Sequence, residues 1–290
     1  MLRRYFLSPW RSEALLVAGL KTCATVAGIV VVLIFAFLLR ESVPLMHQLT
    51  LSRFLFDESW HPTEQMFGIA PMIAGTFYVM MGAIILAAPI GIAVALFCEF
   101  YAPRWMARVL RLMLELLAGI PSVVFGFWGL MVLVPLIAEH SPPGPSLLAG
   151  VLILTIMTVP TVALLSGASV ASVPTLYYRS ALALGLSRWS TVWRVIIPAA
   201  RAGFCTSVIL AMGRALGETM AILMVAGNIV QVPRTIFQPV RTLTANIALE
   251  MAYAMGTHRA ALFVSGLILL IMTAVLVLVS ERLQRGLVDA

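Results

Sequence analysis

The chain has 290 residues, of which 61% are hydrophobic and 11% are charged, with a formal net charge of +7. Soluble globular domains contain about 45–50% apolar and about 25% charged residues, so this composition excludes an ordinary soluble domain. The positive charge lies on arginines between apolar stretches, as membrane topology requires. We therefore expect a membrane protein without a nucleic-acid partner.

Six apolar stretches are long enough to cross the roughly 30 Å of hydrocarbon in a bilayer. They lie at 22–39, 69–98, 116–138, 147–170, 202–230 and 260–280. We predict an all-α integral membrane protein with six transmembrane helices. The expected divisions are an N-terminal segment (1–21), a first transmembrane helix (22–39), a loop (40–68), a five-helix core (69–280) that includes a loop at 172–200, and a C-terminal tail (281–290).

The distribution of arginine predicts the orientation in the membrane. Arginines concentrate near the N-terminus, at 104–111, at 179–201 and in the C-terminal tail. Because basic loops stay in the cytoplasm, both termini and the 172–200 loop are predicted to be cytoplasmic. The loops at 40–68 and 228–258 are then predicted to be on the outer side.

The segment between the fourth and fifth stretches is basic and amphipathic. Ser172 and Pro174 are typical of a helix start. Gly185 can end that helix in the left-handed conformation, which glycine adopts without strain. The segment therefore predicts a helix followed by a bend.

A second short helix is predicted after the bend. Ser187 can cap a helix from Arg188 onward, and Pro198 should interrupt it before the fifth stretch. Two interpretations remain open for the resulting helical knob. It could dock into a groove of a partner protein, or it could lie on lipid, which Trp189 and Trp193 fit equally well.

The third stretch is rich in glycine and proline. A basic helix that follows Pro103 is predicted to lie at the membrane interface and to run into this stretch. Gly119, Pro121 and Gly126 then allow a kink and close helix packing, as a gate would need. Glycine and proline are also common in membrane helices generally, which is the alternative explanation.

The fifth stretch holds an arginine at depth. Arg214 lies about 20 Å of helix beyond Arg201, and such a residue costs about 2.5–3.5 kcal/mol at mid-span. Glu218 follows four residues later, so the two can pair on one face. They could form a structural ion pair, with Gly213 and Gly217 admitting a neighbouring helix. Alternatively, Arg214 could line a water-filled path and bind an anion.

The knob resembles a known family motif. Ala181, Gly185 and the Val-Ile-Ile-Pro sequence at 195–198 are similar to the EAA loop of ABC importer permeases, although Arg179 stands where that motif has glutamate. The resemblance implies a coupling helix that docks on a separate ATPase subunit. Its contact residues would be Arg179, Ala181, Gly185, Arg188 and Pro198.

Other strings narrow the resemblance. GRALGETMA, AGIPSVV and RTLTANIALE resemble the PstC-type permeases of phosphate ABC importers. The family implies the type I importer (MetI-like) fold in a bacterial inner membrane, and phosphate uptake by alternating access. It also implies three kinds of partner: a PstA-type permease, a dimer of PstB-type ATPase subunits and a periplasmic phosphate-binding protein. The apolar spans add membrane lipid as a further expected partner.

The chemistry would then reside outside this chain. The sequence contains no G-x4-G-K-[ST] motif, so ATP and Mg²⁺ are expected on the ATPase. Neither an enzymatic activity nor a metal site is expected here. Two alternatives remain: a permease for another tetrahedral oxyanion such as molybdate or sulfate, and a secondary anion transporter. The latter should show an inverted repeat, yet no second GRALGE-like segment occurs.

Overall fold

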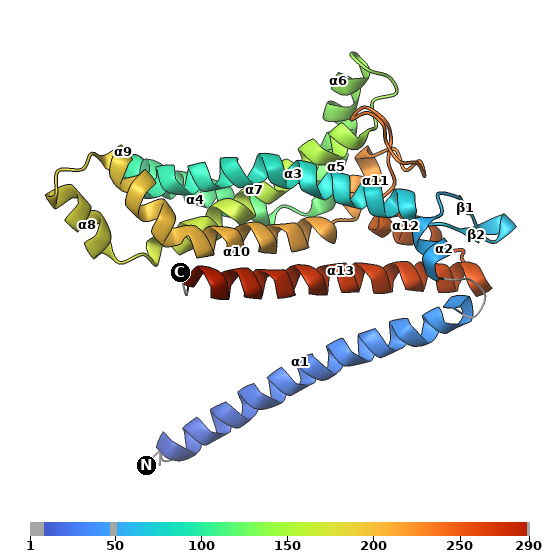
Figure 1. Cartoon of the computed structure of the whole chain (residues 1–290), viewed down its shortest axis with the longest axis horizontal. Coiled ribbons are helices and arrows are strands. Elements are labelled where there is room, and N and C mark those ends of the chain that lie inside the picture. The colour runs from blue at the N-terminus through green and yellow to red at the C-terminus, as the bar shows by residue number, and fades with distance from the viewer. Residues whose placement is uncertain (1–8, 47–50, 289–290) are drawn as a thin grey trace, which may run out of the picture.

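Four long helices lie side by side in this computed structural model, which describes residues 9–46 and 51–288 (Figure 1). They are α3 (Ala70–Leu96), α7 (Leu147–Ala171), α10 (Ile197–Leu216) and α13 (Gly256–Val288). A π-helical turn, η2 (Phe97–Tyr101), extends α3. α3 packs along α7, and α10 contacts α3, α7 and α13. These helices form the core of a bundle.

The described residues contain five helices long and apolar enough to cross a membrane, and six candidate spans if one bent pair counts as a single span. This agrees with the predicted all-α membrane fold. The spans are Leu16–Leu45, Ala70–Tyr101, Leu147–Ala171, Arg188–Leu216 and Gly256–Leu283, with the bent pair Arg104–Gly119 and Ser122–Ala138.

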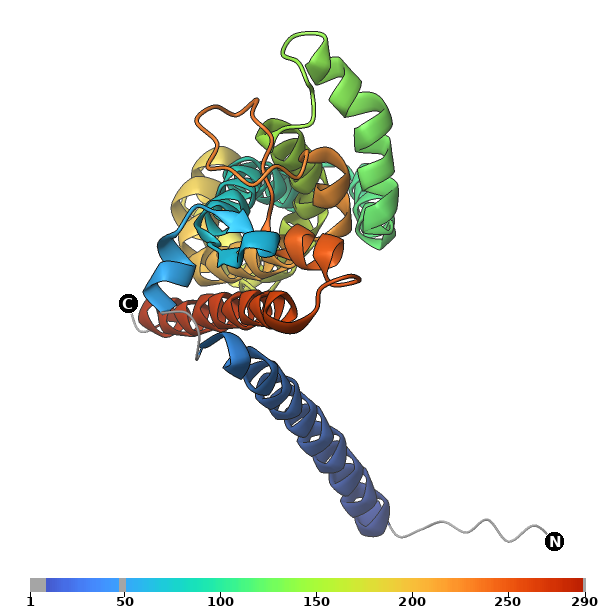
Figure 2. The same cartoon turned by 90° about the vertical axis from the view of Figure 1, so that its right-hand side faces the viewer.

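The first helix stands apart from the bundle. α1 (Pro9–Met46) starts away from the bundle and packs against α13 only in its later part (Figures 1 and 2). Phe37 meets Phe263 edge to face, with ring centroids 5.5 Å apart. Most other apolar side chains of α1 are exposed, including Val32 and Leu33. The helix begins well before residue 22, where the first span was predicted to start, and it offers a long apolar surface to lipid or another subunit.

The third span is sharply bent. α4 (Arg104–Gly119) and the helices that follow it make an angle of 92°. Those helices are α5 (Ser122–Trp128), the π-turn η3 (Gly129–Leu133) and α6 (Val134–Ala138). Ile120 and Pro121 are extended at the bend, with ψ angles of 130° and 139°. The helical conformation is disfavoured for Ile120 because it precedes a proline. The predicted kink is present. The segment 116–138, predicted as a single span, includes the bend and is therefore not one straight helix.

α4 also differs from its predicted role. It runs alongside α7 instead of continuing straight into the next helix (Figure 1). Leu117 and Ile120 pack on a buried cluster that contains Phe125 and Ile153. The expectation that α4 runs directly into the third span was therefore wrong, whereas its position at the membrane interface stays a prediction.

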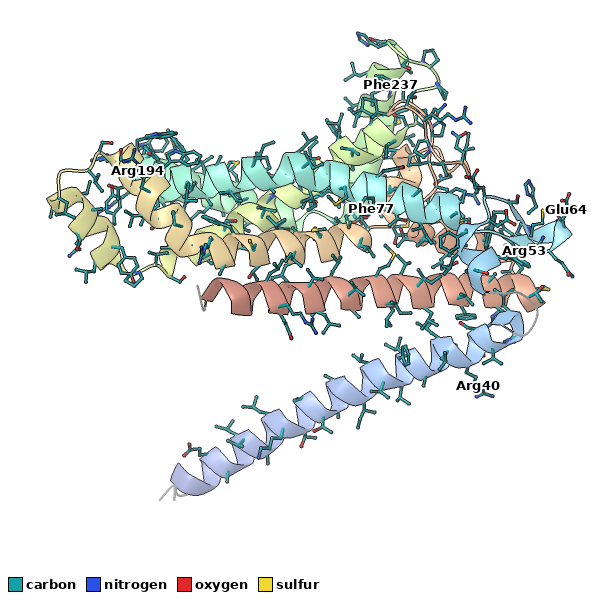
Figure 3. All side chains as sticks on the ribbon, in the orientation of Figure 1. Arg40, Arg53, Glu64, Phe77, Arg194 and Phe237 are labelled. Carbon is teal, nitrogen blue, oxygen red and sulfur yellow. The ribbon has the colours of Figure 1, made fainter. Side chains whose placement is uncertain are left out.

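The two ends of the bundle have different structures. At one end, the knob end, lie α8 (Thr175–Ala183) and α9 (Arg188–Thr191), and the start of α1 and the end of α13 lie on the same side (Figure 1). At the other, the loop end, lie α2 (Leu51–Phe56), the paired strands β1 (Trp60–His61) and β2 (Met66–Phe67) around the turn η1 (Pro62–Glu64), and α12 (Leu243–Glu250). Figure 3 shows Arg194 at the knob end and Glu64 at the loop end.

Candidate functional site

The fifth span is broken near its end. α10 stops at Leu216, and Gly217 to Thr219 leave the helix before α11 (Met220–Val225) begins. The prediction of one continuous helix over 202–230 was therefore wrong. Non-helical backbone at membrane depth is tolerated only where its polar groups find partners or line a cavity. The partners at this break define the first candidate site.

Side chains from within the break and from another helix form hydrogen bonds with its free backbone groups. A carboxylate oxygen of Glu218 (Oε1) accepts a hydrogen bond from the backbone N–H of Ala221 at 3.3 Å and so caps α11. The backbone carbonyl of Glu218 accepts a hydrogen bond from Thr244 Oγ1 on α12 at 2.9 Å. Because Thr244 is distant in sequence, local patterns did not reveal the break.

Arg214 lies in the last turn of α10 and reaches across to α7. Its Nη1 donates a hydrogen bond to Thr161 Oγ1 at 3.3 Å. Along the axis of α7, Thr161 lies about 21 Å from the start of the helix at Leu147 and about 15 Å from its end at Ala171. Arg214 therefore contacts α7 near the middle of that helix, and it is exposed in the described chain. Its position deep in the membrane stays a prediction.

The expected ion pair between Arg214 and Glu218 is not formed. Among the described residues, ion pairs join Glu99 to Arg111 and Glu250 to both Arg241 and His258. The helix ends between Arg214 and Glu218, so the four-residue spacing that brings side chains together on a helix no longer applies. Arg214 consequently carries a charge with no carboxylate partner in the described chain.

The glycines around the break also differ from expectation. A Cβ added at Gly213 would meet nothing within 4 Å, and one at Gly217 would meet only carbonyl oxygens of the same chain segment, at 3.8 Å. Close helix packing occurs instead at Gly126, where an added Cβ would lie 2.9 Å from Ala221 Cα. Gly119, beside the bend, is open. The idea of a gate at these residues stays a prediction.

The second candidate site is the knob, residues 172–200. α8 ends at Ala183, and Gly185, the residue after the C-cap Leu184, has a φ of +82°. The backbone N–H groups of Leu186 and Gly185 donate to the carbonyls of Ala181 and Leu182 at 3.1 and 3.0 Å, which is the Schellman arrangement. Ser187 then caps α9, accepting from the N–H of Ser190 at 3.2 Å. The bend and the cap are where the sequence predicted them.

The knob's two ends were predicted incorrectly. Ser172 does not start α8; it is the C-cap of α7, and its hydroxyl donates to the Ser169 carbonyl at 2.7 Å. Pro174 itself is the N-cap. Pro198 does not interrupt the chain either, since helix continues from Arg188 to Leu216. A π-turn, η4 (Val192–Ile196), precedes Pro198 and can accommodate its missing N–H.

The knob presents cationic and aromatic groups to its surroundings. Ala181 is buried, whereas Arg179 and Arg188 are exposed. Trp189 and Trp193 are 63% and 53% exposed, with ring centroids 5.4 Å apart. Arg179 also lines a cavity of about 260 Å³ at the end of α7. Such a surface suits either a protein groove or lipid headgroups.

A buried polar network at the loop end was missed by the sequence reasoning. Glu250 is 7% exposed and accepts from Arg241 Nη1 at 2.7 Å and from Trp60 Nε1 at 3.0 Å. His258 Nε2 lies 2.8 Å from the same carboxylate. Arg241 Nε also donates to the Asn228 carbonyl at 2.8 Å. The only local signal was a lone glutamate at the end of an apolar helix.

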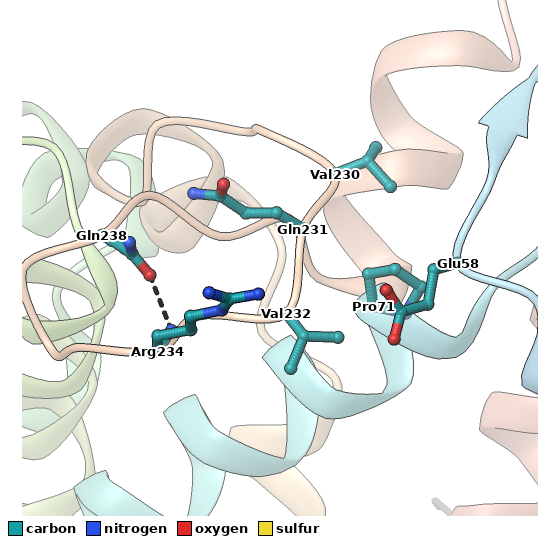
Figure 4. A pocket seen from close by; sticks show the side chains of 7 residues that line it. All are labelled: Glu58, Pro71, Val230, Gln231, Val232, Arg234 and Gln238. Carbon is teal, nitrogen blue, oxygen red and sulfur yellow. Dashed lines mark hydrogen bonds between the residues drawn. The ribbon is translucent and has the colours of Figure 1, made fainter.

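A pocket of about 550 Å³ lies at the loop end (Figure 4). Glu58 comes from the 40–68 loop, and Gln231, Arg234 and Gln238 come from the 228–258 loop. The backbone N–H of Arg234 donates to Gln238 Oε1 at 2.6 Å. The two loops predicted to lie outside therefore meet at one mixed-charge surface.

Solved structures define the class of protein to which this fold belongs. The chain superposes on a subunit of the MetNI methionine ABC transporter in inward-facing conformations with a TM-score of 0.59 and 17% identity, covering 76% of this chain and 94% of that one. A bacterial alginate ABC transporter, in complex with an alginate-bound periplasmic protein, gives a TM-score of 0.61 at 16% identity, covering 94% of this chain and 96% of that one. The fold is that of ABC importer permeases.

Sequence comparison identifies the family. Residues 87–289 match the model of the binding-protein-dependent transport system inner membrane component, and the chain belongs to this family. A probable ABC transporter permease protein of Bacillus subtilis, YqgH, is 41% identical over 80% of this chain and 77% of its own. The phosphate transport system permease protein PstC of Haemophilus influenzae is 33% identical over 96% of this chain and 95% of its own.

Proposed function

We propose that this chain is a transmembrane permease subunit of an ATP-driven importer of inorganic phosphate. The observation that carries the proposal is the Arg214 guanidinium, which contacts Thr161 near the middle of α7 and has no carboxylate partner in the described chain. It occurs in a chain similar over 96% of its length to a protein named as a phosphate permease. A guanidinium can bind two oxygens of a tetrahedral oxyanion at once, which suits this cargo.

The orientation follows from charge. The start of α1 and the end of α13 lie on the same side as the arginine-rich knob (Figure 1). The positive-inside rule places this end in the cytoplasm and the loop end in the periplasm. The protein is then a bacterial inner-membrane protein with both termini cytoplasmic.

The partners follow from the surfaces. At the cytoplasmic face the knob, with Arg179, Gly185 and Arg188, docks on a dimer of PstB-type ATPase subunits, which hold ATP and Mg²⁺. At the periplasmic face the pocket beside Arg234 receives a phosphate-binding protein. The exposed apolar surface of α1 contacts a second, PstA-type permease subunit or lipid. This chain itself performs no covalent chemistry.

Alternating access would use the breaks in the spans. ATP binding closes the ATPase dimer and moves the knob, which is continuous with α10 through η4. That movement repositions Arg214 against α7 and shifts α5, which packs on α11, so the path opens toward the periplasm. Arg214 then stabilises the anion briefly, and ATP hydrolysis resets the inward-open state.

Uptake of radiolabelled phosphate by phosphate-starved cells tests the cargo. Deletion of the gene should abolish high-affinity uptake, and restoration of the gene should recover it, in the presence of excess unlabelled molybdate or sulfate. Unchanged phosphate uptake after deletion would reject phosphate as the cargo. If deletion abolishes phosphate uptake, but excess molybdate or sulfate also suppresses that uptake in the wild type, the permease would be assigned to another tetrahedral oxyanion.

A further inference from the structure

A groove lined by arginines lies at the knob end, outside the sites described above. It has a volume of about 690 Å³ between η2 and α4. Arg104, Arg108 and Arg111 line it from one side of α4, and Cys98 and Glu99 line it from η2. Residues spaced by three and four lie on one helix face, so the three guanidiniums are presented to the same groove.

Two of these arginines have no counter-charge. Arg111 donates to Glu99 Oε2 at 2.6 Å, and this ion pair balances the charge of Arg111. In the part of the chain that the structure describes, neither Arg104 nor Arg108 forms an ion pair, and both are exposed. Glu115 lines the groove too, but it lies about 10 Å of helix beyond Arg108. The groove is therefore cationic at the end nearest the start of α4.

The same helix carries an exposed apolar stripe beside the arginines. Trp105, Val109, Leu112 and Leu116 are 44–65% exposed, and Leu112 also lines the groove. Arginine beside tryptophan and leucine is the arrangement of segments at the boundary between headgroups and hydrocarbon. This arrangement supports a groove at the membrane surface, where lipid phosphate groups are found.

We propose that Arg104 and Arg108 form a binding site for a phosphate group at the knob end of the bundle. Guanidinium forks on adjacent helical turns can share the oxygens of one such group, and Arg111 is kept in place by Glu99. The phosphate group belongs either to an anionic phospholipid or to free inorganic phosphate, since both present the same charged oxygens. This site does not depend on the identity of the transported cargo.

The test uses the assembled transporter complex carrying R104Q and R108Q together. Retention of phosphatidylglycerol from mixed phosphatidylcholine–phosphatidylglycerol micelles is measured by native mass spectrometry. Binding of labelled inorganic phosphate is measured in parallel in nanodiscs of phosphatidylcholine alone. One arginine near an anionic surface contributes about 1 kcal/mol, so losing both should weaken binding roughly 30-fold. The R104K and R108K double variant keeps the charge and should lose less.

Arg282, near the end of α13 and exposed, provides the control R282Q, which should bind like the wild type. Loss confined to phosphatidylglycerol would assign the site to a lipid headgroup. Loss confined to inorganic phosphate would assign it to the free ion. Wild-type binding of both probes by R104Q and R108Q, or an equal loss in R282Q, would overturn the proposal.

Discussion

Replacing Arg214 by alanine should abolish most transport while leaving the complex assembled. In the described structure the side chain makes one hydrogen bond, at 3.3 Å to Thr161, so its removal costs the fold little. It also removes a charge whose insertion at mid-span costs about 2.5–3.5 kcal/mol. Losing one charged hydrogen-bond donor to the anion costs about 1.5–3 kcal/mol, which predicts a decrease in transport of roughly 10- to 100-fold.

Labelled-phosphate uptake by the purified complex in liposomes measures the effect, with assembly checked by co-purification of the partner subunits. Thr161→Val is the matched control: it removes the hydrogen bond to Arg214 but keeps the cation, so it should retain most transport. Normal uptake by Arg214→Ala would refute a role in the path. Failure of Arg214→Ala to assemble, with uptake lost in proportion, would show instead that the arginine is structural.

Three further substitutions test other parts of the structure. Gly185→Val should lower co-purification of the ATPase, because a β-branched side chain at a φ of +82° costs about 1–2 kcal/mol. Asparagine tolerates this conformation, so Gly185→Asn should bind the ATPase almost normally. Equal binding by both variants would show that the bend does not determine ATPase binding. Glu250→Gln should lower the melting temperature, since it removes a buried carboxylate and leaves partly buried Arg241 without a counter-charge, at a cost of about 3 kcal/mol. An unchanged melting temperature would contradict this. Gly126→Leu should destabilise by about 1–3 kcal/mol through overpacking, whereas Gly119→Ala, with open space around its Cβ, should be neutral in the same thermal assay.

Local features of the sequence predicted the parts of the fold that depend on neighbouring residues. Hydrophobic length predicted where the chain crosses the membrane, because an apolar segment of about 20 residues is sufficient to span the hydrocarbon. Gly185 and Ser187 predicted the bend and cap of the knob, since both depend on backbone groups within a few residues. Pro121 predicted a kink for the same reason.

Only the tertiary structure decided how the candidate site is built. Thr244 satisfies the carbonyl of Glu218 from another helix, and Thr161 receives Arg214 from across the bundle. The four-residue spacing predicted a pair between Arg214 and Glu218, but this spacing brings side chains together only on a continuous helix, and α10 ends at Leu216. Whether a membrane helix can break depends on whether distant groups satisfy its exposed backbone, and those groups come together only when the chain folds.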